Sequence, residues 1–106
     1  MDCVFCKIAK GEIPSKKAYE DDKVLAFYDL EPQAPVHILI IPKEHIESAQ
    51  DITPQNIFEV AAKLAKENHL DSGFRIVNNA GKDGGQTVPH LHFHLLGGRS
   101  MKWPPG

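Results

Sequence analysis

Residues 90–96 read His-Leu-His-Phe-His-Leu-Leu, and this alternation decides how the rest of the chain is interpreted. A period of two is the period of a β-strand, so Leu91, Phe93 and Leu95 are expected to face a core. The histidines then form a row on the opposite face: His90, His92 and His94. Burying polar side chains on an apolar strand costs free energy unless they make hydrogen bonds or bind a ligand. The row therefore predicts a functional site; the alternative is a solvated strand face that happens to carry histidine.

The spacing of this row limits the chemistry that it can perform. At about 3.3 Å per residue, His90 and His94 lie roughly 13 Å apart along a strand. Zinc–nitrogen bonds are about 2.0–2.1 Å long, so one ion cannot bind all three imidazoles. Neighbouring members could share a metal, but at least one imidazole is left for nucleophilic, acid–base or anion-binding work near pH 7. The pattern favours such chemistry over a three-histidine metal cage.

Composition and charge are those of an ordinary small globular protein. The chain has 106 residues, 42% of them hydrophobic and 25% charged, which predicts one domain spanning residues 1–106. The formal net charge of -2 gives no electrostatic reason to expect nucleic acid or a membrane surface as a partner. No apolar run approaches the roughly 20 residues of a membrane span, and the N-terminus lacks a signal-peptide pattern. A cytoplasmic location is expected.

Turn signals divide the chain into short elements. Gly11 and Pro14 end a short helix expected at 4–10. Thr53 and Pro54 suit the N-cap and first position of a longer helix that runs to about Leu70. Strands are expected at 24–28, 36–41, 74–78 and 88–96. Strands on both sides of one long helix, with short connections, predict an α+β fold with an antiparallel sheet.

Both cysteines lie in one element, Cys3-Val4-Phe5-Cys6. Two cysteines are too few for a secreted disulfide scaffold, and the element has no preceding βαβ pattern of a thioredoxin-like motif. A Cys-x-x-Cys pair supplies half of a zinc site, and two further ligands must come from elsewhere. The alternative is a pair of reduced cysteines packed as small apolar residues.

A glycine-rich loop precedes the histidine row. Gly81, Gly84 and Gly85 permit the backbone N–H groups to approach a phosphate closely. The loop has no Gly-Lys-Ser/Thr sequence, which excludes a P-loop. An ordinary hairpin loop is equally compatible with this segment.

The alternating histidines match His-φ-His-φ-His-φ-φ, where φ is hydrophobic, and the chain resembles the Hint branch of the histidine-triad (HIT) superfamily. Further matching segments are AFYDL at 26–30, QAPVH at 33–37, IPKEHI at 41–46, DGGQT at 83–87, LGGR at 96–99 and WPPG at 103–106. The resemblance implies a HIT-like fold, with a five-stranded antiparallel sheet, one long helix and one short helix. It also implies a two-fold dimer that joins the two sheets.

The resemblance further implies a hydrolase that cleaves the P–N bond of adenosine or other purine nucleoside 5'-phosphoramidates. His92 would be the nucleophile and form a covalent nucleotidyl-histidine intermediate. His94 and His37 would contact the phosphate or tune the histidine row, and the hydroxyl of Thr87 would reach the leaving group. In bacterial proteins of this type a Cys-x-x-Cys element completes a closed, structural zinc site. By position its ligands here are Cys3, Cys6, His45 and His90.

The same resemblance assigns the residues that bind the nucleotide. Asp29 would accept hydrogen bonds from both ribose hydroxyls, although an aspartate before Glu31-Pro32 also suits a turn. Apolar surface for the base is expected from five residues, each of which suits an ordinary core equally well: Phe5, Ile8, Phe27, Leu30 and Ile38. Phosphate contacts are expected from Asn79 and Gln86. Trp103, held by the two prolines that follow it, is expected to shape the substrate pocket of the partner subunit; the alternative is a frayed terminus.

Other functions are compatible with these residues. A dinucleotide polyphosphate hydrolase or nucleotidyl transferase would use the same histidines, but the Trp103-Pro104-Pro105-Gly106 ending favours the Hint branch. A nucleotide-binding regulatory protein would retain the pocket with only incidental catalysis. A purely structural zinc module would leave His92 and His94 unexplained.

Overall fold

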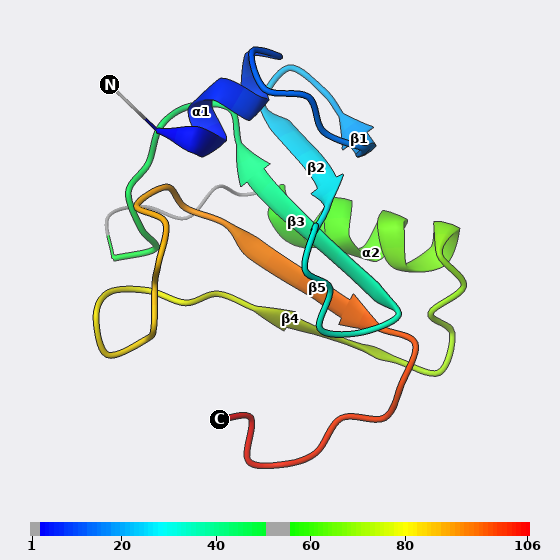
Figure 1. The fold of residues 1–106 in the computed structure, drawn as a ribbon. Coiled ribbons are helices and arrows are strands. Elements are labelled where there is room, and N and C mark those ends of the chain that lie inside the picture. The colour runs from blue at the N-terminus through cyan, green and yellow to red at the C-terminus, as the bar shows by residue number, and fades with distance from the viewer. Residues whose placement is uncertain (1–2, 51–55) are drawn as a thin grey trace.

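One antiparallel sheet of five strands organises the computed structural model, which describes residues 3–50 and 56–106 (Figure 1). The strand order is β1-β2-β3-β5-β4, so β3 lies at the centre and β1 and β4 form the edges. The strands are β1 Lys17–Glu20, β2 Val24–Tyr28, β3 Val36–Pro42, β4 Phe74–Val77 and β5 Phe93–Gly97. The helices are α1 Val4–Ala9 and α2 Ile57–Glu67. The predicted α+β fold with an antiparallel sheet is confirmed.

The central strands are apolar on both faces because a different cluster of side chains covers each face. Ile38 and Ile40 of β3 pack with the apolar face of α2, which lies behind the sheet in Figure 1. The alternate residues Leu39 and Ile41 pack instead with Phe5 of α1. This alternation follows from the strand period of two. The sheet therefore separates a large core under α2 from a smaller one under α1.

The pairing of β3 with β5 determines which histidines meet. His94 lies directly opposite Leu39, and Leu96 lies opposite His37. His37 and His94 are consequently diagonal neighbours on one face, close enough for long side chains to interact. That face is the one that carries the smaller cluster, because Leu39 belongs to it.

The histidine strand is shorter than the sequence predicts. The expectation of a strand over 88–96 is wrong for residues 88–92, because β5 begins only at Phe93. The backbone N–H of His90 donates to Val88, and that of Leu91 donates to Ile46, so neither joins the ladder of β5. The apolar alternation nevertheless holds, since the core contains all three predicted side chains: Leu91, Phe93 and Leu95.

Other boundaries differ in smaller ways. Strand β1 was not expected, because Lys17–Glu20 has no apolar alternation and forms a charged edge strand. The long helix ends at Glu67 rather than near Leu70, since His69 takes a left-handed backbone conformation with φ 59°. α1 and β4 end one residue earlier than expected and β3 one residue later. The predicted helix start at Thr53-Pro54 lies outside the described residues.

Helix α2 is held by its apolar stripe and by a C-terminal cap, in which the side chain of Asn68 donates to the carbonyl of Leu64. Ile57, Leu64 and Ala65 are buried on one side, whereas Asn56 makes no side-chain capping hydrogen bond.

Among the described residues, no helix has both the length and the apolar character that crossing a membrane requires.

Replacement of Leu64 by alanine tests this stripe. Leu64 is fully buried in the core, so Leu64→Ala is expected to lower the free energy of unfolding by about 2–5 kcal/mol. Glu59→Ala, on the exposed side of the same helix, serves as the matched control and is expected to change it by about 0.5 kcal/mol or less. Urea unfolding measures both. Equal effects of the two substitutions would contradict the packing described here.

Candidate functional site

A cavity of about 590 Å³ opens on the sheet face that carries α1. Its lining comes from α1, the end of β2, the turn before β3 and the segment that leads into β5. This is the size of a small-molecule site. Nine of the residues predicted to act on a nucleotide line it: Phe5, Ile8, Phe27, Asp29, Leu30, His37, Thr87, His92 and His94.

A backbone carbonyl determines which ring nitrogen of His92 carries the proton. Nδ1 of His92 lies 2.7 Å from the carbonyl oxygen of His90. A carbonyl only accepts, so Nδ1–H donates and the neutral ring keeps a bare lone pair on Nε2. The ring is 4% exposed, and the ring of Phe5 packs edge-on against it with centroids 5.1 Å apart. In its neutral form His92, whose side chain lines the cavity, thus carries its lone pair on Nε2.

His37 and His94 form a hydrogen-bonded pair of defined polarity. The backbone N–H of Gln33 donates to Nδ1 of His37 over 3.0 Å. The proton of the neutral His37 ring is therefore on Nε2, which lies 2.8 Å from Nδ1 of His94. Nδ1 of His94 must accept this bond, which leaves Nε2–H as the remaining donor of the His94 ring.

Burial keeps both rings of this pair neutral. It lowers the pKa of His37, although the carboxylate of Asp29 opposes the shift. Burial, followed by the rings of His92 and His37, lowers the pKa of His94 from 6.5 to about 4. A neutral ring gives His94 one donor and one acceptor, as the hydrogen-bond pattern requires.

Asp29 divides its carboxylate between a turn and the cavity. One oxygen accepts from the backbone N–H of Glu31 over 2.8 Å, which is the turn that the sequence also suggested. The other oxygen lies 3.4 Å from Nε2 of His37. Asp29, His37 and His94 thus also group closely enough to hold a metal. However, the bond between the two histidines already uses one nitrogen of each ring.

A second cluster lies beside the cavity, where α1 approaches the segment before β5. The ligand atoms of its four residues all lie within 4.8 Å of one another: Cys3, Cys6, His45 and His90. Nδ1 of His90 is 3.3 Å from the sulfur of Cys3, and Nδ1 of His45 is 3.2 Å from that of Cys6. Sulfur and nitrogen ligands of a tetrahedral zinc ion lie roughly 3.5 Å apart, given zinc bonds of about 2.3 and 2.0 Å.

The chemistry of this cluster also fits a metal ion. Nε2 of His90 lies 2.9 Å from the carbonyl of Pro42 and donates to it, so the lone pair of Nδ1 faces the sulfurs. Burial lowers the pKa of His90 and raises that of the Cys6 thiol, which the neighbouring Cys3 raises further. A cation among these groups offsets the cost of placing two thiolates side by side.

Four residues predicted to contact the nucleotide do not line this cavity. Of the described residues, these are Ile38, Asn79, Gln86 and Trp103. Ile38 instead packs in the core under α2, because it lies on the opposite face of β3. The side-chain amide of Gln86 instead accepts from Gly81 and donates to Glu47 and Val88, so it ties the glycine-rich loop together. Trp103 is 81% exposed on the C-terminal tail.

The sequence did not predict the roles of two residues in this site. Gln33 lines the cavity and orients His37 through its backbone. Asn78 donates its side-chain N–H to the carbonyl of His92 over 2.9 Å and so supports the irregular segment before β5. Neither role has a sequence signal, because a backbone donor carries none and the Asn78 contact spans 14 residues.

Known proteins resemble this chain over nearly its whole length. The HIT domain family profile matches residues 10–101. A Brassica juncea protein named 14 kDa zinc-binding protein is 51% identical over 114 residues, covering 99% of this chain and 100% of that protein. The chain belongs to the HIT domain family.

Solved structures lead to the same family. A HIT family hydrolase from Legionella pneumophila Philadelphia 1 is 49% identical with a TM-score of 0.91, covering 99% of this chain and 100% of the other. A histidine triad nucleotide-binding protein from Candida albicans is 38% identical with a TM-score of 0.83, covering 99% and 85%. Both likenesses extend over nearly the whole of this chain.

The lowered pKa of His94 predicts a loss of stability in mild acid. The unfolded chain binds a proton at this histidine near pH 6.5, whereas the folded protein does so only near pH 4. Stability from the neutral ring is therefore complete above pH 6.5 and is lost as the pH falls to 4. When the pH is lowered from 7 to 4.5, the free energy of unfolding is expected to fall in both proteins. The fall in His94→Gln is expected to be smaller than that in the wild type by on the order of 2 kcal/mol.

Urea unfolding at the two pH values measures this difference. His69→Asn is the matched control, because His69 is exposed on the turn after α2. It is expected to lose as much stability as the wild type. An equal loss in His94→Gln and the wild type would show that His94 titrates normally.

Proposed function

We propose that this protein is a nucleotide-binding hydrolase of the Hint branch that cleaves the P–N bond of purine nucleoside 5'-phosphoramidates. The observation that carries the proposal is the Nε2 lone pair of His92, which the bond from Nδ1–H to the His90 carbonyl leaves free in the neutral ring. A neutral imidazole is a good nucleophile, and a cationic one is a good leaving group from phosphorus. Both properties are needed when one residue takes up and releases a nucleotidyl group.

In the first step Nε2 of His92 attacks the α-phosphorus and the P–N bond breaks. The electron pair of that bond leaves with the nitrogen, which takes up a proton and departs as the amine. Thr87 is exposed and lines the cavity, so its hydroxyl can pass this proton from solvent. In the second step water attacks the phosphorus and gives up a proton to solvent. The bond to Nε2 breaks, its electron pair returns to the ring of His92, and the nucleoside monophosphate is released.

His94 is proposed to stabilise the charge that develops on the phosphoryl oxygens. Its Nε2–H is the donor left over after Nδ1 accepts from His37. A donor that is already oriented toward the developing charge needs no reorganisation during the reaction. His37 would act behind His94 and out of reach of the phosphorus.

The nucleoside is proposed to lie across the α1 side of the cavity. The carboxylate oxygen of Asp29 that faces His37 and does not accept from Glu31 would accept from the ribose hydroxyls. The base would contact the apolar lining formed by Phe5, Ile8, Phe27 and Leu30. Phosphate contacts from Asn79 and Gln86 remain part of the proposal, although Gln86 must release a loop hydrogen bond to make one.

A two-fold dimer would complete this arrangement. Joining two sheets requires an unpaired edge strand, and β4 is an edge that also carries the 45% exposed side chain of Phe74. The C-terminal tail lies beside the same strand, since Arg75 donates to the carbonyl of Lys102. Trp103 at this edge would then reach the pocket of the partner subunit.

We also propose that the Cys₂His₂ cluster holds a structural zinc ion. Four protein ligands close the coordination sphere, so zinc would supply a cross-link and no Lewis acid. It would join α1 to the segment before β5 through Cys3 and His90. Since the carbonyl of His90 accepts from His92, the ligand also helps to orient the proposed nucleophile.

Removal of the nucleophile separates catalysis from binding. His92→Ala is expected to lower kcat for an adenosine phosphoramidate by roughly a thousandfold or more, because bond formation to phosphorus is lost. AMP affinity is expected to stay within about threefold. His94→Ala is expected to be milder, since it removes one of several electrostatic contacts.

Single-turnover cleavage and calorimetry with AMP measure these effects, with His69→Ala as an exposed control. Mass spectrometry of the wild type with substrate is expected to detect a nucleotidyl adduct. If His92→Ala retained near wild-type cleavage, or if His94→Ala were the inactive variant, the proposed roles would be wrong.

The zinc proposal predicts about one zinc per chain in protein purified without chelator. Cys6→Ser and His45→Ala are expected to lose the metal, whereas His69→Ala retains it. Removal of zinc is expected to lower the melting temperature more than it lowers turnover per folded molecule, because the metal only cross-links the fold. Elemental analysis and thermal unfolding test both statements; protein that carries no metal when isolated would contradict them.

A further inference from the structure

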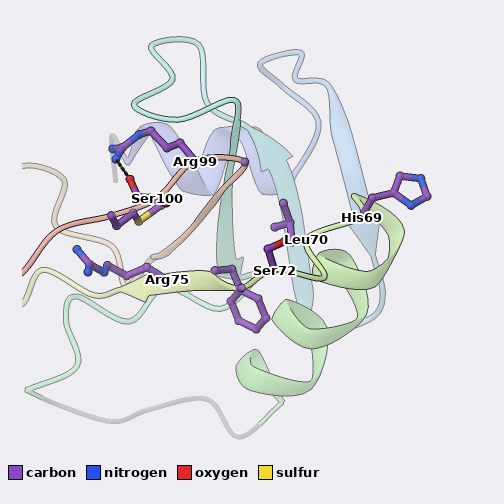
Figure 2. Close-up of a pocket in the computed structure, with 10 residues that line it drawn as sticks. His69, Leu70, Ser72, Arg75, Arg99 and Ser100 are labelled. Carbon is purple, nitrogen blue, oxygen red and sulfur yellow. Dashed lines mark hydrogen bonds between the residues drawn. The ribbon is translucent and has the colours of Figure 1, made fainter.

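Arg99 is bound to a turn that lies far from it in the sequence. It follows β5, and its guanidinium donates to the backbone carbonyl of Gln33 through Nη2 at 3.0 Å and Nε at 3.3 Å. Nη1 donates to the carbonyl of Ser100, the bond drawn dashed in Figure 2. The rigid fork of an arginine is suited to holding one carbonyl with two donors.

The residue that Arg99 holds is the one that orients His37. The carbonyl of Gln33 accepts from Arg99, while its backbone N–H donates to Nδ1 of His37. These two groups lie on either side of one Cα atom. A movement of the Gln33 turn as a whole away from Arg99 therefore weakens the bond to His37 as well.

His37 transmits this constraint to His94. Because Nδ1 of His37 accepts from Gln33, Nε2–H must be the atom that donates to Nδ1 of His94 over 2.8 Å. Without the Gln33 donor, His37 could carry its proton on either nitrogen, and the bond to His94 could reverse. The donor-to-acceptor direction of this series of hydrogen bonds is thus set at Gln33.

Packing presses the two segments together at the same corner. Gly98 has a left-handed φ of 94°, and a Cβ atom there would lie 2.8 Å from the Cβ of Pro35. Only glycine allows so close an approach in this conformation. The backbone of Gly98 therefore packs against the ring of Pro35, two residues after Gln33, and this contact adds to the one made by the guanidinium.

We propose that Arg99 is a positioning residue that acts through Gln33 and His37 to keep Nε2–H of His94 as the donor offered to the cavity. The kinetic consequence rests on the proposed function, whereas the structural consequence does not. Arg75 offers a matched comparison, since it borders the same surface pocket and donates to the carbonyl of Lys102 (Figure 2). The carbonyl of Lys102 takes no part in the series of hydrogen bonds that leads to His94.

The test compares Arg99→Ala, Arg99→Lys and Arg75→Ala in the full-length protein. In Arg99→Ala, exchange of the Gln33 amide hydrogen is expected to rise about tenfold. Imidazole ¹⁵N spectra are expected to contain a second tautomer of His94. For cleavage of an adenosine phosphoramidate, kcat is expected to fall about three- to tenfold with KM within about twofold.

Arg99→Lys keeps one donor and is expected to lie between wild type and Arg99→Ala in all three measurements. Arg75→Ala is expected to match the wild type in amide exchange and in the His94 tautomer, the two measurements that do not depend on the tail carrying Trp103. If Arg99→Ala has wild-type amide exchange and a single His94 tautomer, the positioning role is overturned even when the protein cleaves phosphoramidates. If the wild type itself has no such activity, the proposed function fails, and the exchange rates and spectra still decide the role of Arg99.

Discussion

The pairing of β3 with β5 is the constraint on which the rest of this structure depends. It places the centre of the sheet between two apolar clusters, one under α2 and the other under α1. The same pairing makes His37 and His94 diagonal neighbours on the face that carries the cavity. A slip of one residue would turn His94 toward the α2 core, because strand side chains alternate between faces. Fold and site are therefore set by one register.

Backbone groups, rather than other charged side chains, determine the protonation pattern of the site. The carbonyl of Pro42 accepts from His90, the carbonyl of His90 accepts from His92, and the amide of Gln33 donates to His37. Backbone polarity cannot change with pH. Each neutral ring consequently keeps one defined tautomer. Burial separately lowers the pKa of His94, which keeps that ring neutral. Such a site offers both a bare nitrogen and an N–H donor to one ligand.

The irregular segment before β5 explains how adjacent histidines of one row serve different purposes. A regular strand would align His90, His92 and His94 on a single face. Because β5 begins only at Phe93, His90 instead joins the Cys₂His₂ cluster while His92 lines the cavity. Asn78 and the contact of Leu91 with Ile46 satisfy backbone groups that the missing ladder leaves unpaired. The departure from regular structure thus divides the row between two sites.

The sequence by itself determined the α+β class, the apolar alternation of Leu91, Phe93 and Leu95, and the row of histidines between them. These follow from local periodicity and residue type. The grouping of His45 and His90 with the two cysteines was implied only by the family resemblance. Only the tertiary structure decided that the strand begins at Phe93, that Lys17–Glu20 forms an edge strand, and that Gln33 orients His37. Those features depend on backbone donors and acceptors, which are identical at nearly every residue. Packing therefore determines which donor meets which acceptor, and the local sequence does not predict these pairs.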